Sequence, residues 1–399
     1  MNSALADRIN AMAESATIAM ANKARELKSQ GIDVISLSLG EPDFKTPRHI
    51  CEAAKQAIDE GLYFAYPPVP GYPELRKAIA GKLKTENGIE CAPENIVVSN
   101  GAKHSIMNVM LCLLNPGDEV VVLAPYWVSY VEMIRLAEAE PVIISGGIDQ
   151  EFKVTADQLE SAITPKTKAI IYSSPCNPTG AVFSRIEMEA FARVLNSHPG
   201  IYAIADEIYE YINFTGEHVS MATLPGMADR TITVNGFSKG HAMTGWRVGY
   251  VAAPKWLASA CNKMQGQFTS GVCGIAQRAA LAALNGDPEP TRQMAATYRR
   301  RRELVLEMLR QIPGIVPNNP EGAFYVFPDV SAYFGKSYGA HVIRDAEDLC
   351  MYLLNEAHVS VVGGAAFGAP ECLRISYAAS DEQLVESLKR IRESLARLN

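Results

Sequence analysis

The sequence lacks the features that would place the protein in a membrane, outside the cell or on a nucleic acid. No apolar run approaches the roughly 18 residues of a membrane-spanning helix, and the start MNSALADRINAMAES has no secretory-signal pattern. The 37 basic residues are outnumbered by 44 acidic ones, so no basic excess favours a nucleic-acid partner. None of the eight cysteines forms a C-x-x-C pair, which argues against structural zinc. We expect a reduced, cytoplasmic protein without a membrane segment or a metal ion.

Short apolar runs alternate with stretches of helical length between about residues 90 and 285. The runs predict strands at 95–99, 119–124, 139–144, 168–173, 201–206, 230–236 and 246–253. The clearest helical stretches cover 104–114, 127–139 and 185–198. Because strands that alternate with helices need crossover connections, this part of the chain predicts a mostly parallel mixed sheet between helices.

The pattern changes after residue 286. Residues 287–311 predict one long charged helix, on which the basic run 299–302 is expected to form a solvated face. Further short strands and a C-terminal helix follow, at 322–330, 358–368, 373–378 and 382–398. We therefore predict an α/β fold with a large domain over residues 46–286. A smaller α/β domain would be built from both termini, residues 1–45 and 287–399.

The segment 236–240 allows two kinds of chemistry. It reads Gly-Phe-Ser-Lys-Gly and matches the G-x-S-x-G elbow of serine hydrolases, with Ser238 as nucleophile. The nominal partners in that case are Asp329 and either His341 or His358, although no HGGG-type motif accompanies them. The same segment places Lys239 at a strand end, eight residues before Arg247. A desolvated lysine close to cations suits covalent attachment to a carbonyl compound. No P-loop or dinucleotide motif is present.

Residues 235–250 resemble the pyridoxal-phosphate attachment region of class I aminotransferases. Six further segments resemble motifs of that family, in the family's order: 66–76, 99–103, 124–130, 174–180, 206–211 and 373–377. The resemblance extends from residue 15 to the C-terminal helix and is greatest to bacterial aspartate aminotransferases, some of which also accept prephenate. It implies the pyridoxal-phosphate fold type I, pyridoxal 5'-phosphate (PLP) as cofactor and a homodimer.

The resemblance also implies which residues hold the cofactor. Lys239 would be its covalent anchor and a proton carrier, and Asp206, at the end of an apolar run, would keep the ring nitrogen protonated. Trp127 would lie on the face of the ring, and Asn177 and Tyr209 would bind the ring oxygen. The phosphate of the cofactor would be bound by Gly101, Ala102, Lys103, Ser238, Arg247 and Tyr66 of the neighbouring subunit. A helix start plus positive charge is the usual solution for phosphate.

Substrate contacts follow from the same resemblance. Arg374, between apolar residues on a predicted strand, would bind the α-carboxylate through its two parallel N–H groups. The other expected contacts are Gly40, Trp127 and Asn177 near the reacting end and Lys103, Ser15 and Thr17 at a distal carboxylate. One departure concerns the distal end, because relatives often read K-P-S-A-T where this chain has Ala13 and Glu14 before Ser15.

These residues predict transamination between aspartate or glutamate and a 2-oxo acid, such as 2-oxoglutarate or oxaloacetate, with prephenate as a further substrate. An aminotransferase for aromatic, alanine-like or basic amino acids is the alternative within the same chemistry. A cofactor-binding regulator on the same fold is the alternative outside enzymes, although the chain carries no added DNA-binding segment and retains every expected catalytic residue.

Overall fold

A computed structural model describes residues 4–339 and 341–399. Its centre is a seven-stranded sheet in the order β2-β8-β7-β6-β5-β3-β4. The strands are β2 (Ile96–Ser99), β3 (Glu119–Ala124), β4 (Glu140–Ser145), β5 (Thr167–Ser173), β6 (Tyr202–Asp206), β7 (Thr231–Gly236) and β8 (Gly249–Ala252). Only β8 runs antiparallel to both of its neighbours, β2 and β7, and the other pairs are parallel.

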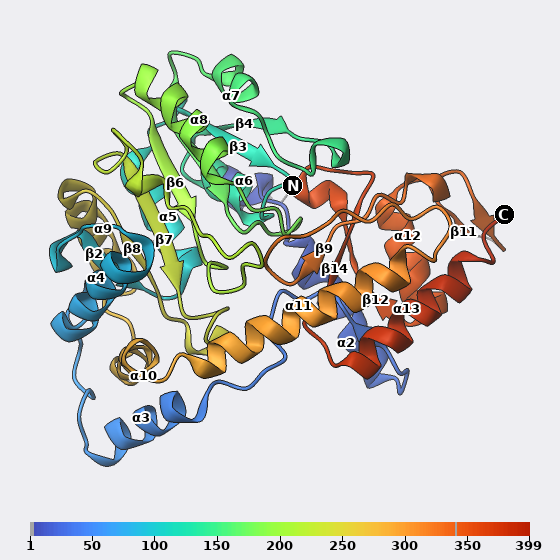
Figure 1. The fold of residues 1–399 in the computed structure, drawn as a ribbon, viewed down its shortest axis with the longest axis horizontal. Helices are drawn as coiled ribbons and strands as arrows, with labels where there is room; N and C mark the ends of the chain where they lie inside the picture. Colours follow the sequence, from blue (N-terminus) through green and yellow to red (C-terminus); the bar gives the residue numbers. More distant parts are fainter. Residues whose placement is uncertain (1–3, 340) are drawn as a thin grey trace.

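Helices cover both faces of this sheet (Figure 1). They are α4 (Pro73–Asn87), α5 (Ala102–Leu113), α6 (Ser129–Leu136), α7 (Ala156–Ala162), α8 (Arg185–Ser197), α9 (Lys255–Phe268) and α10 (Gly274–Asn285), and α3 (Arg48–Asp59) packs against α10. Alternate residues of β3 enter different cores: Val120 and Val122 pack with α5, α6 and α9, whereas Val121 and Leu123 pack with α8. This two-sided burial explains why the strands read as continuous apolar runs.

The smaller part of the molecule combines both ends of the chain. Its helices are α2 (Ala16–Ser29), α11 (Glu289–Leu309), α12 (Ala346–Tyr352) and α13 (Asp381–Leu395), and the short exposed helix α1 (Asp7–Ala11) precedes α2. Its strands are β1 (Ile35–Ser36), β9 (Tyr325–Val326), β10 (Ser337–Tyr338), β11 (His341–Val342), β12 (Val359–Ser360), β13 (Val362–Gly363) and β14 (Leu373–Ser376). Ile35 pairs with Val359, so the N-terminal and C-terminal segments share a sheet. Figure 1 shows α11 running from α10 toward this part.

The predicted α/β fold with a mostly parallel mixed sheet is confirmed. The strand predicted at 246–253 begins only at Gly249, because residues 244–246 form a 3-10 turn. The small-domain strands are shorter than predicted, with β9 limited to two residues of the run 322–330. The domain limits at 45/46 and 286/287 stay predictions, and residues 1–3 and 340 of the predicted smaller domain lie outside the described residues.

The basic run 299–302 is solvated at Arg299 and Arg300, so the prediction of a solvated face is wrong only for Arg301 and Arg302. Arg300 is exposed, but the side chain of Arg301 is only 8% exposed and lies between Asp43 and Asp381. Arg302 donates to the carbonyl of Pro320 at 2.8 Å. The reason is that α11 packs against other segments on more than one side, so Arg301 and Arg302 bind those segments.

No helix among the described residues combines the length and the apolar character needed to cross a membrane. The eight cysteines are all free thiols.

Candidate active site

A cavity of about 460 Å³ opens where the carboxyl ends of β5 and β6 meet the smaller part of the molecule. Ser173 ends β5 and Asp206 ends β6, and both line the cavity. Lys239 follows β7 in a turn and lines it too. Open α/β sheets bind ligands at this edge because the strand ends present their side chains and loops there.

Lys239 is the central cation of the cavity. Its Nζ donates a hydrogen bond to the carbonyl oxygen of Gly40 and lies 5.7 Å from the ring centre of Tyr209. Burial, together with the positive charges of Arg374 and Arg247, lowers the pKa of Lys239 to about 8 against the opposing effects of Glu41 and Asp206. A substantial fraction of this amine is therefore neutral near physiological pH, which a nucleophilic lysine requires.

Asp206 is a buried carboxylate at the end of β6. Tyr130 Oη donates to its Oδ2 at 2.6 Å, and the backbone N–H of Ile208 donates to its Oδ1 at 3.3 Å. Burial raises the pKa of Asp206 to about 6 even though these hydrogen bonds and Lys239 favour the ionised form. A cationic N–H group placed against this carboxylate would offset the cost of its burial.

Arg374 on β14 is only 1% exposed. Its Nη1 donates to Asn177 Oδ1 at 2.9 Å and its Nη2 to the carbonyl oxygen of Ser38 at 2.5 Å. Its guanidinium lies 4.6 Å from the ring centre of Tyr325 and 4.9 Å from that of Phe367. The Nε hydrogen is buried without an acceptor. Such an arginine can receive a carboxylate from the cavity.

The start of α5 forms an anion cradle beside Lys239. Gly101 caps this 12-residue helix with φ of 82°, a conformation that favours glycine. A Cβ on Gly101 would lie 2.5 Å from Arg247 Nη2, so the missing side chain lets the guanidinium approach. Arg247 donates to the carbonyls of Thr244 at 3.0 Å and Asn100 at 3.2 Å. The free N–H groups of a helix start and this charge suit a phosphate.

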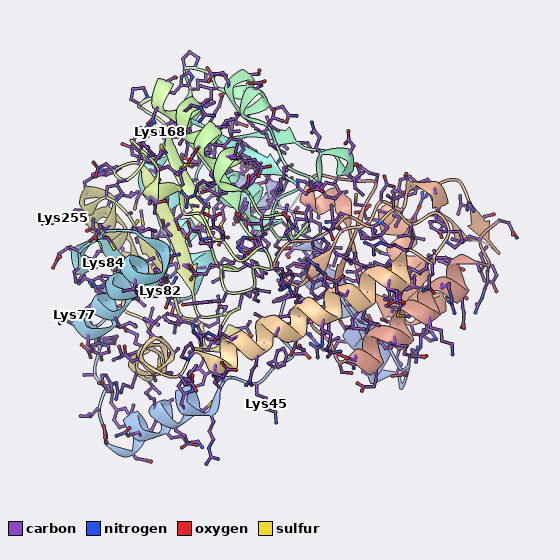
Figure 2. The ribbon with its side chains drawn as sticks, in the orientation of Figure 1. Lys45, Lys77, Lys82, Lys84, Lys168 and Lys255 are labelled. Carbon is purple, nitrogen blue, oxygen red and sulfur yellow. The ribbon has the colours of Figure 1, made fainter. Side chains whose placement is uncertain are left out.

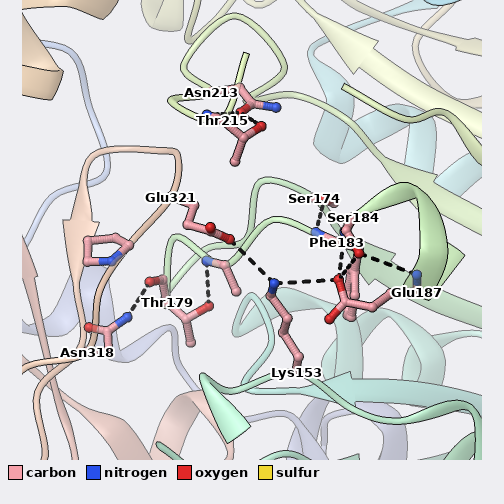
Figure 3. Close-up of polar contacts among 12 residues, drawn as sticks. Lys153, Ser174, Thr179, Phe183, Ser184, Glu187, Asn213, Thr215, Asn318 and Glu321 are labelled. Carbon is pink, nitrogen blue, oxygen red and sulfur yellow. Dashed lines mark hydrogen bonds and ion pairs between the residues drawn. The ribbon is translucent and has the colours of Figure 1, made fainter. Parts of the chain in front are cut away.

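Residues of the C-terminal part of the chain bind the loop that carries Asn177, and Figure 3 shows Asn318 beside Thr179 of this loop. Asn318 Nδ2 donates to the carbonyl of Thr179 at 2.7 Å. The carbonyl of Gly180 accepts the N–H groups of Glu321 and Gly322, each at 2.8 Å. Lys153 Nζ lies 3.4 Å from Glu321 and 3.5 Å from Glu187, as Figure 3 shows.

The other end of the cavity is formed by Lys103 and the N-terminal segment. Lys103 Nζ lies 3.2 Å from Ser129 Oγ and 5.3 Å from the ring centre of Trp127. Burial, with a contribution from Arg247, lowers the pKa of Lys103. Thr17 lines the same cavity, whereas Ser15 lines an adjoining one of about 650 Å³ that shares Lys103. The Ser15 and Thr17 hydroxyl oxygens lie 2.9 Å apart.

Comparison with known proteins shows the family to which this chain belongs. The family described as "Aminotransferase class I and II" matches residues 32–391. The chain belongs to the class I and II aminotransferases. It is 48% identical to the bifunctional aspartate aminotransferase and glutamate/aspartate-prephenate aminotransferase of Petunia hybrida, over 98% of this chain and 82% of that protein. It is 47% identical to an aspartate/prephenate aminotransferase of Cereibacter sphaeroides, over 99% of each chain.

The fold of this aminotransferase is that of solved family members. The crystal structure of the aspartate aminotransferase from Rhizobium meliloti aligns with a TM-score of 0.95 at 41% identity, over 99% of each chain. The Thermus thermophilus enzyme with maleate aligns with a TM-score of 0.92, also at 41% identity, over 99% of this chain and all of that one. The recognition of the family and of fold type I is therefore confirmed.

Enzymes of this family depend on PLP, and the residues of this cavity fit that group. Asp206 is a buried carboxylate that needs a cationic partner, as a protonated ring nitrogen provides. Gly101 and Arg247 form a phosphate cradle at the start of α5. Lys239 lines the same cavity as Asp206 and Arg247. The donor set thus matches a ring that carries a basic nitrogen, an aldehyde and a phosphate.

The structure brings together most of the site residues predicted from sequence. The cavity is lined by Gly40, Ala102, Lys103, Trp127, Asn177, Asp206, Tyr209, Ser238, Arg247, Arg374 and Thr17 together with Lys239. Three predicted residues lie elsewhere: Gly101 is buried beneath Arg247, Ser15 faces the adjoining cavity, and Tyr66 is 96% exposed on the surface. The roles assigned to all of these residues stay predictions.

Two tyrosines of the cavity carried no role in the sequence analysis. Tyr130 binds Asp206, and Tyr325 forms a 2.7 Å hydrogen bond with Tyr209. The signal for Tyr130 is its spacing of three residues from Trp127, which places both on one side of a helical turn. Tyr325 stands in a buried two-residue strand, where a hydroxyl needs a partner.

Two other groups of residues have the composition of a site. Glu207, Glu210 and His218 lie close enough to hold a metal ion. However, Lys82 of α4, labelled in Figure 2, already pairs with Glu210, and its ammonium supplies the positive charge there. In the elbow alternative, the carboxylate of Asp329 accepts the N–H of Ser331 at 2.8 Å, and His358 Nδ1 lies 3.4 Å from the carbonyl of Leu354. Neither contact brings these residues to Ser238, and the His341 side chain lies outside the described ones.

Proposed function

We propose that the protein transfers the amino group of aspartate or glutamate to a 2-oxo acid, 2-oxoglutarate or oxaloacetate, by a ping-pong route. The observation that carries this proposal is the presence of two cations, Arg374 and Lys103, in the one cavity that also holds Lys239. A dicarboxylic amino acid has two carboxylates to place, and each of these cations can bind one. The names of the relatives, aspartate aminotransferases and aspartate/prephenate aminotransferases, support the same substrates.

Bound PLP supplies an electron sink for chemistry at the substrate Cα. Lys239 Nζ would hold this group and would carry the proton that leaves Cα. The carbonyl of Gly40 is placed to hold that free amine, because it accepts a hydrogen bond from Nζ. Asp206 keeps negative charge at the position where the ring nitrogen would lie, and Tyr130 orients it. These fixed charges need no reorganisation during the reaction, which is the usual source of large electrostatic rate effects.

Arg374 binds the substrate α-carboxylate and thereby orients the Cα–H bond. Asn177 is locked in one orientation, because its Oδ1 accepts from Arg374. The Nδ2 of Asn177 is therefore the group that would donate a hydrogen bond to the ring oxygen of the cofactor. Trp127, in the β3–α6 connection, would cover the face of the cofactor ring, and its edge-on contact with Tyr130, with 5.5 Å between ring centres, fixes the angle of the indole.

The active form is proposed to be a homodimer. Tyr66 is almost fully exposed in this chain, and the large apolar side chains of Leu62, Phe64 and Phe268 are exposed as well. Apolar side chains gathered on a surface favour a protein partner. We expect Tyr66→Phe to weaken phosphate retention without changing the fold, measured as PLP loss on dialysis and by sedimentation. An active monomer in sedimentation would contradict the dimer. The eight free cysteines support a reducing compartment such as the cytoplasm.

The test of the substrate assignment is an amino-donor panel against 2-oxoglutarate, oxaloacetate, pyruvate and prephenate. The donors are aspartate, glutamate, alanine, phenylalanine and lysine. We expect kcat/KM for aspartate and glutamate to exceed that for alanine by roughly tenfold or more, the effect of one additional charged hydrogen bond. A phenylalanine or lysine donor that outperforms aspartate would favour the aromatic or basic alternative. Transamination to prephenate would place the enzyme with the relatives that carry that name.

A further inference from the structure

Residues 38–44, here called the strap, cross the mouth of the cavity between β1 and α3. Leu39, Gly40 and Glu41 of the strap line the cavity. The strap has no helix or strand hydrogen bonds of its own, so its position depends on its attachments. Three of these attachments lead into the active site: the Ser38 carbonyl to Arg374, the Gly40 carbonyl to Lys239 and the Glu41 carboxylate to Thr244.

The far end of the strap is attached outside the active site, to α11. Arg301 Nη1 donates to Asp43 Oδ1 at 2.8 Å, and Arg301 Nε donates to Asp381 Oδ1 at 3.2 Å. The guanidinium also lies 5.3 Å from the ring centre of Phe44. Phe44 in turn packs edge-on against Tyr298 of α11, with 5.4 Å between ring centres. Arg301 therefore joins the strap to α11 and to the first residue of α13.

The strap has little room to move without consequence for the site. A Cβ on Gly40 would lie 2.3 Å from Tyr325 Oη, so the backbone already passes against the tyrosine that binds Tyr209. A shift of the strap would displace the Gly40 carbonyl from Lys239 Nζ. Misplacement of a catalytic contact by about 1 Å can lower a rate by roughly 100-fold.

We propose that Arg301 is a positioning residue, which fixes the strap through Asp43 and so holds the Gly40 carbonyl against Lys239 during the reaction. This inference rests on the proposed role of Lys239. Arg301 does not line the cavity, so it acts only through the strap. The planar guanidinium of Arg301 presents several N–H groups, so this one side chain binds both Asp43 of the strap and Asp381 of α13.

The chain offers a matched control one residue away. Arg300 stands on the same helix and binds the same Asp381, but its side chain is 59% exposed. Its contacts, unlike those of Arg301, are with Asp381 alone. Arg300→Met therefore removes a contact between α11 and α13 and leaves the strap attached, whereas Arg301→Met releases Asp43.

The first measurement follows the strap itself. Lys45, labelled in Figure 2, is exposed at the end of the strap, and trypsin cleavage after it requires local opening of the chain. We expect Arg301→Met and Asp43→Asn to speed the appearance of the 1–45 fragment by about tenfold, and Arg300→Met to leave it unchanged, because only the first two release the strap. Arg301→Lys, which keeps one ion pair, should fall between them.

The second measurement separates kcat from KM in the PLP-loaded enzyme, with aspartate and with alanine as donors. Because the Gly40 carbonyl acts on the amine released during the chemical step, kcat should fall about tenfold in Arg301→Met and Asp43→Asn while KM changes less than about threefold. Arg301→Lys should recover part of the loss. Arg300→Met should match the wild type in both constants.

Equal behaviour of Arg301→Met and Arg300→Met in cleavage and in kcat would overturn the proposal, as would a loss of kcat without faster cleavage. If Arg301→Met does not fold, Asp43→Asn carries the same test with the arginine intact. The cleavage arm needs no substrate, and the alanine arm does not depend on the dicarboxylic assignment. A failure of that assignment would therefore be seen in the donor panel and not in these results.

Discussion

Replacement of Arg374 by lysine tests the most buried cation of the active site. The guanidinium donates from Nη1 to Asn177 Oδ1 and from Nη2 to the Ser38 carbonyl, and its Nε is buried without an acceptor. A lysine would keep the positive charge between the rings of Tyr325 and Phe367. It would lose the planar fork that can bind a carboxylate through two parallel hydrogen bonds.

The size of the effect follows from the number of bonds lost. An ammonium makes one of the two parallel bonds, so one charged hydrogen bond to the substrate disappears. Such a bond contributes ~1.5–3 kcal/mol, and a tenfold change corresponds to about 1.4 kcal/mol, so kcat/KM should fall roughly 10- to 150-fold. Loss of the contact that orients Asn177 acts in the same direction.

The assay compares aspartate with alanine in the first half-reaction, followed by the visible absorbance of the PLP-loaded enzyme. Both donors carry the α-carboxylate, so Arg374→Lys should lower kcat/KM for both by the same factor, with the melting temperature as a control for folding. A loss confined to aspartate would refute the reasoning, because Arg374 would then read the side chain of the substrate and not its α-carboxylate.

Three further outcomes are expected. Lys103→Ala should lower kcat/KM for aspartate by roughly 10- to 100-fold and leave alanine nearly unchanged; an equal loss for both would assign Lys103 to the cofactor or the fold. Asp206→Asn should lower kcat by about 100-fold or more with no loss of melting temperature, because it removes a charge whose burial is costly; near-normal turnover would contradict its role at the ring nitrogen. Because the pKa of Lys239 is about 8, roughly a tenth of the amine is neutral at pH 7 and about nine tenths at pH 9. The rate of PLP capture by cofactor-free enzyme, measured by stopped-flow absorbance, should rise across this pH range and level off above it. The midpoint of the profile should move to higher pH when succinate occupies Arg374. A flat profile would count against a lowered pKa of Lys239.

The strands of the large sheet could be predicted from sequence because they are buried on both faces and read as apolar runs. Their order in the sheet could not, since nothing local to β8 indicates that it inserts antiparallel between β2 and β7. The predicted strands at 322–330, 358–368 and 373–378 are longer than the observed β9, β13 and β14. The reason is that apolar residues that pack in irregular segments have the same composition as strand residues.

Side chains whose chemistry suits a role, such as Lys239 and Asp206, could be named from the sequence, whereas Tyr130 and the backbone carbonyl of Ser38 could not. Ser38 contributes a backbone carbonyl to Arg374, and a backbone group leaves no trace in residue type. Arg301 lies on the buried stripe of α11 with Met294, Tyr298 and Val305, a spacing of four, three and four residues. That periodicity was visible, but a run of four arginines favoured a solvated face and concealed which of them points inward.

The charges of the active site are coupled in a way that suits the order of events. In the free site, Arg374 and Arg247 both lower the pKa of Lys239, which keeps part of the amine neutral for attachment to PLP. A phosphate beside Arg247 and an α-carboxylate on Arg374 each add negative charge near these cations. The repulsion that disfavours the ammonium form of Lys239 then weakens, and its affinity for a proton rises. We expect the same lysine to be a better nucleophile while the carboxylate site is free and a stronger base once an amino acid has bound. We therefore expect the placement of Arg374 near Lys239 to link the binding of a carboxylate to the proton affinity of this amine.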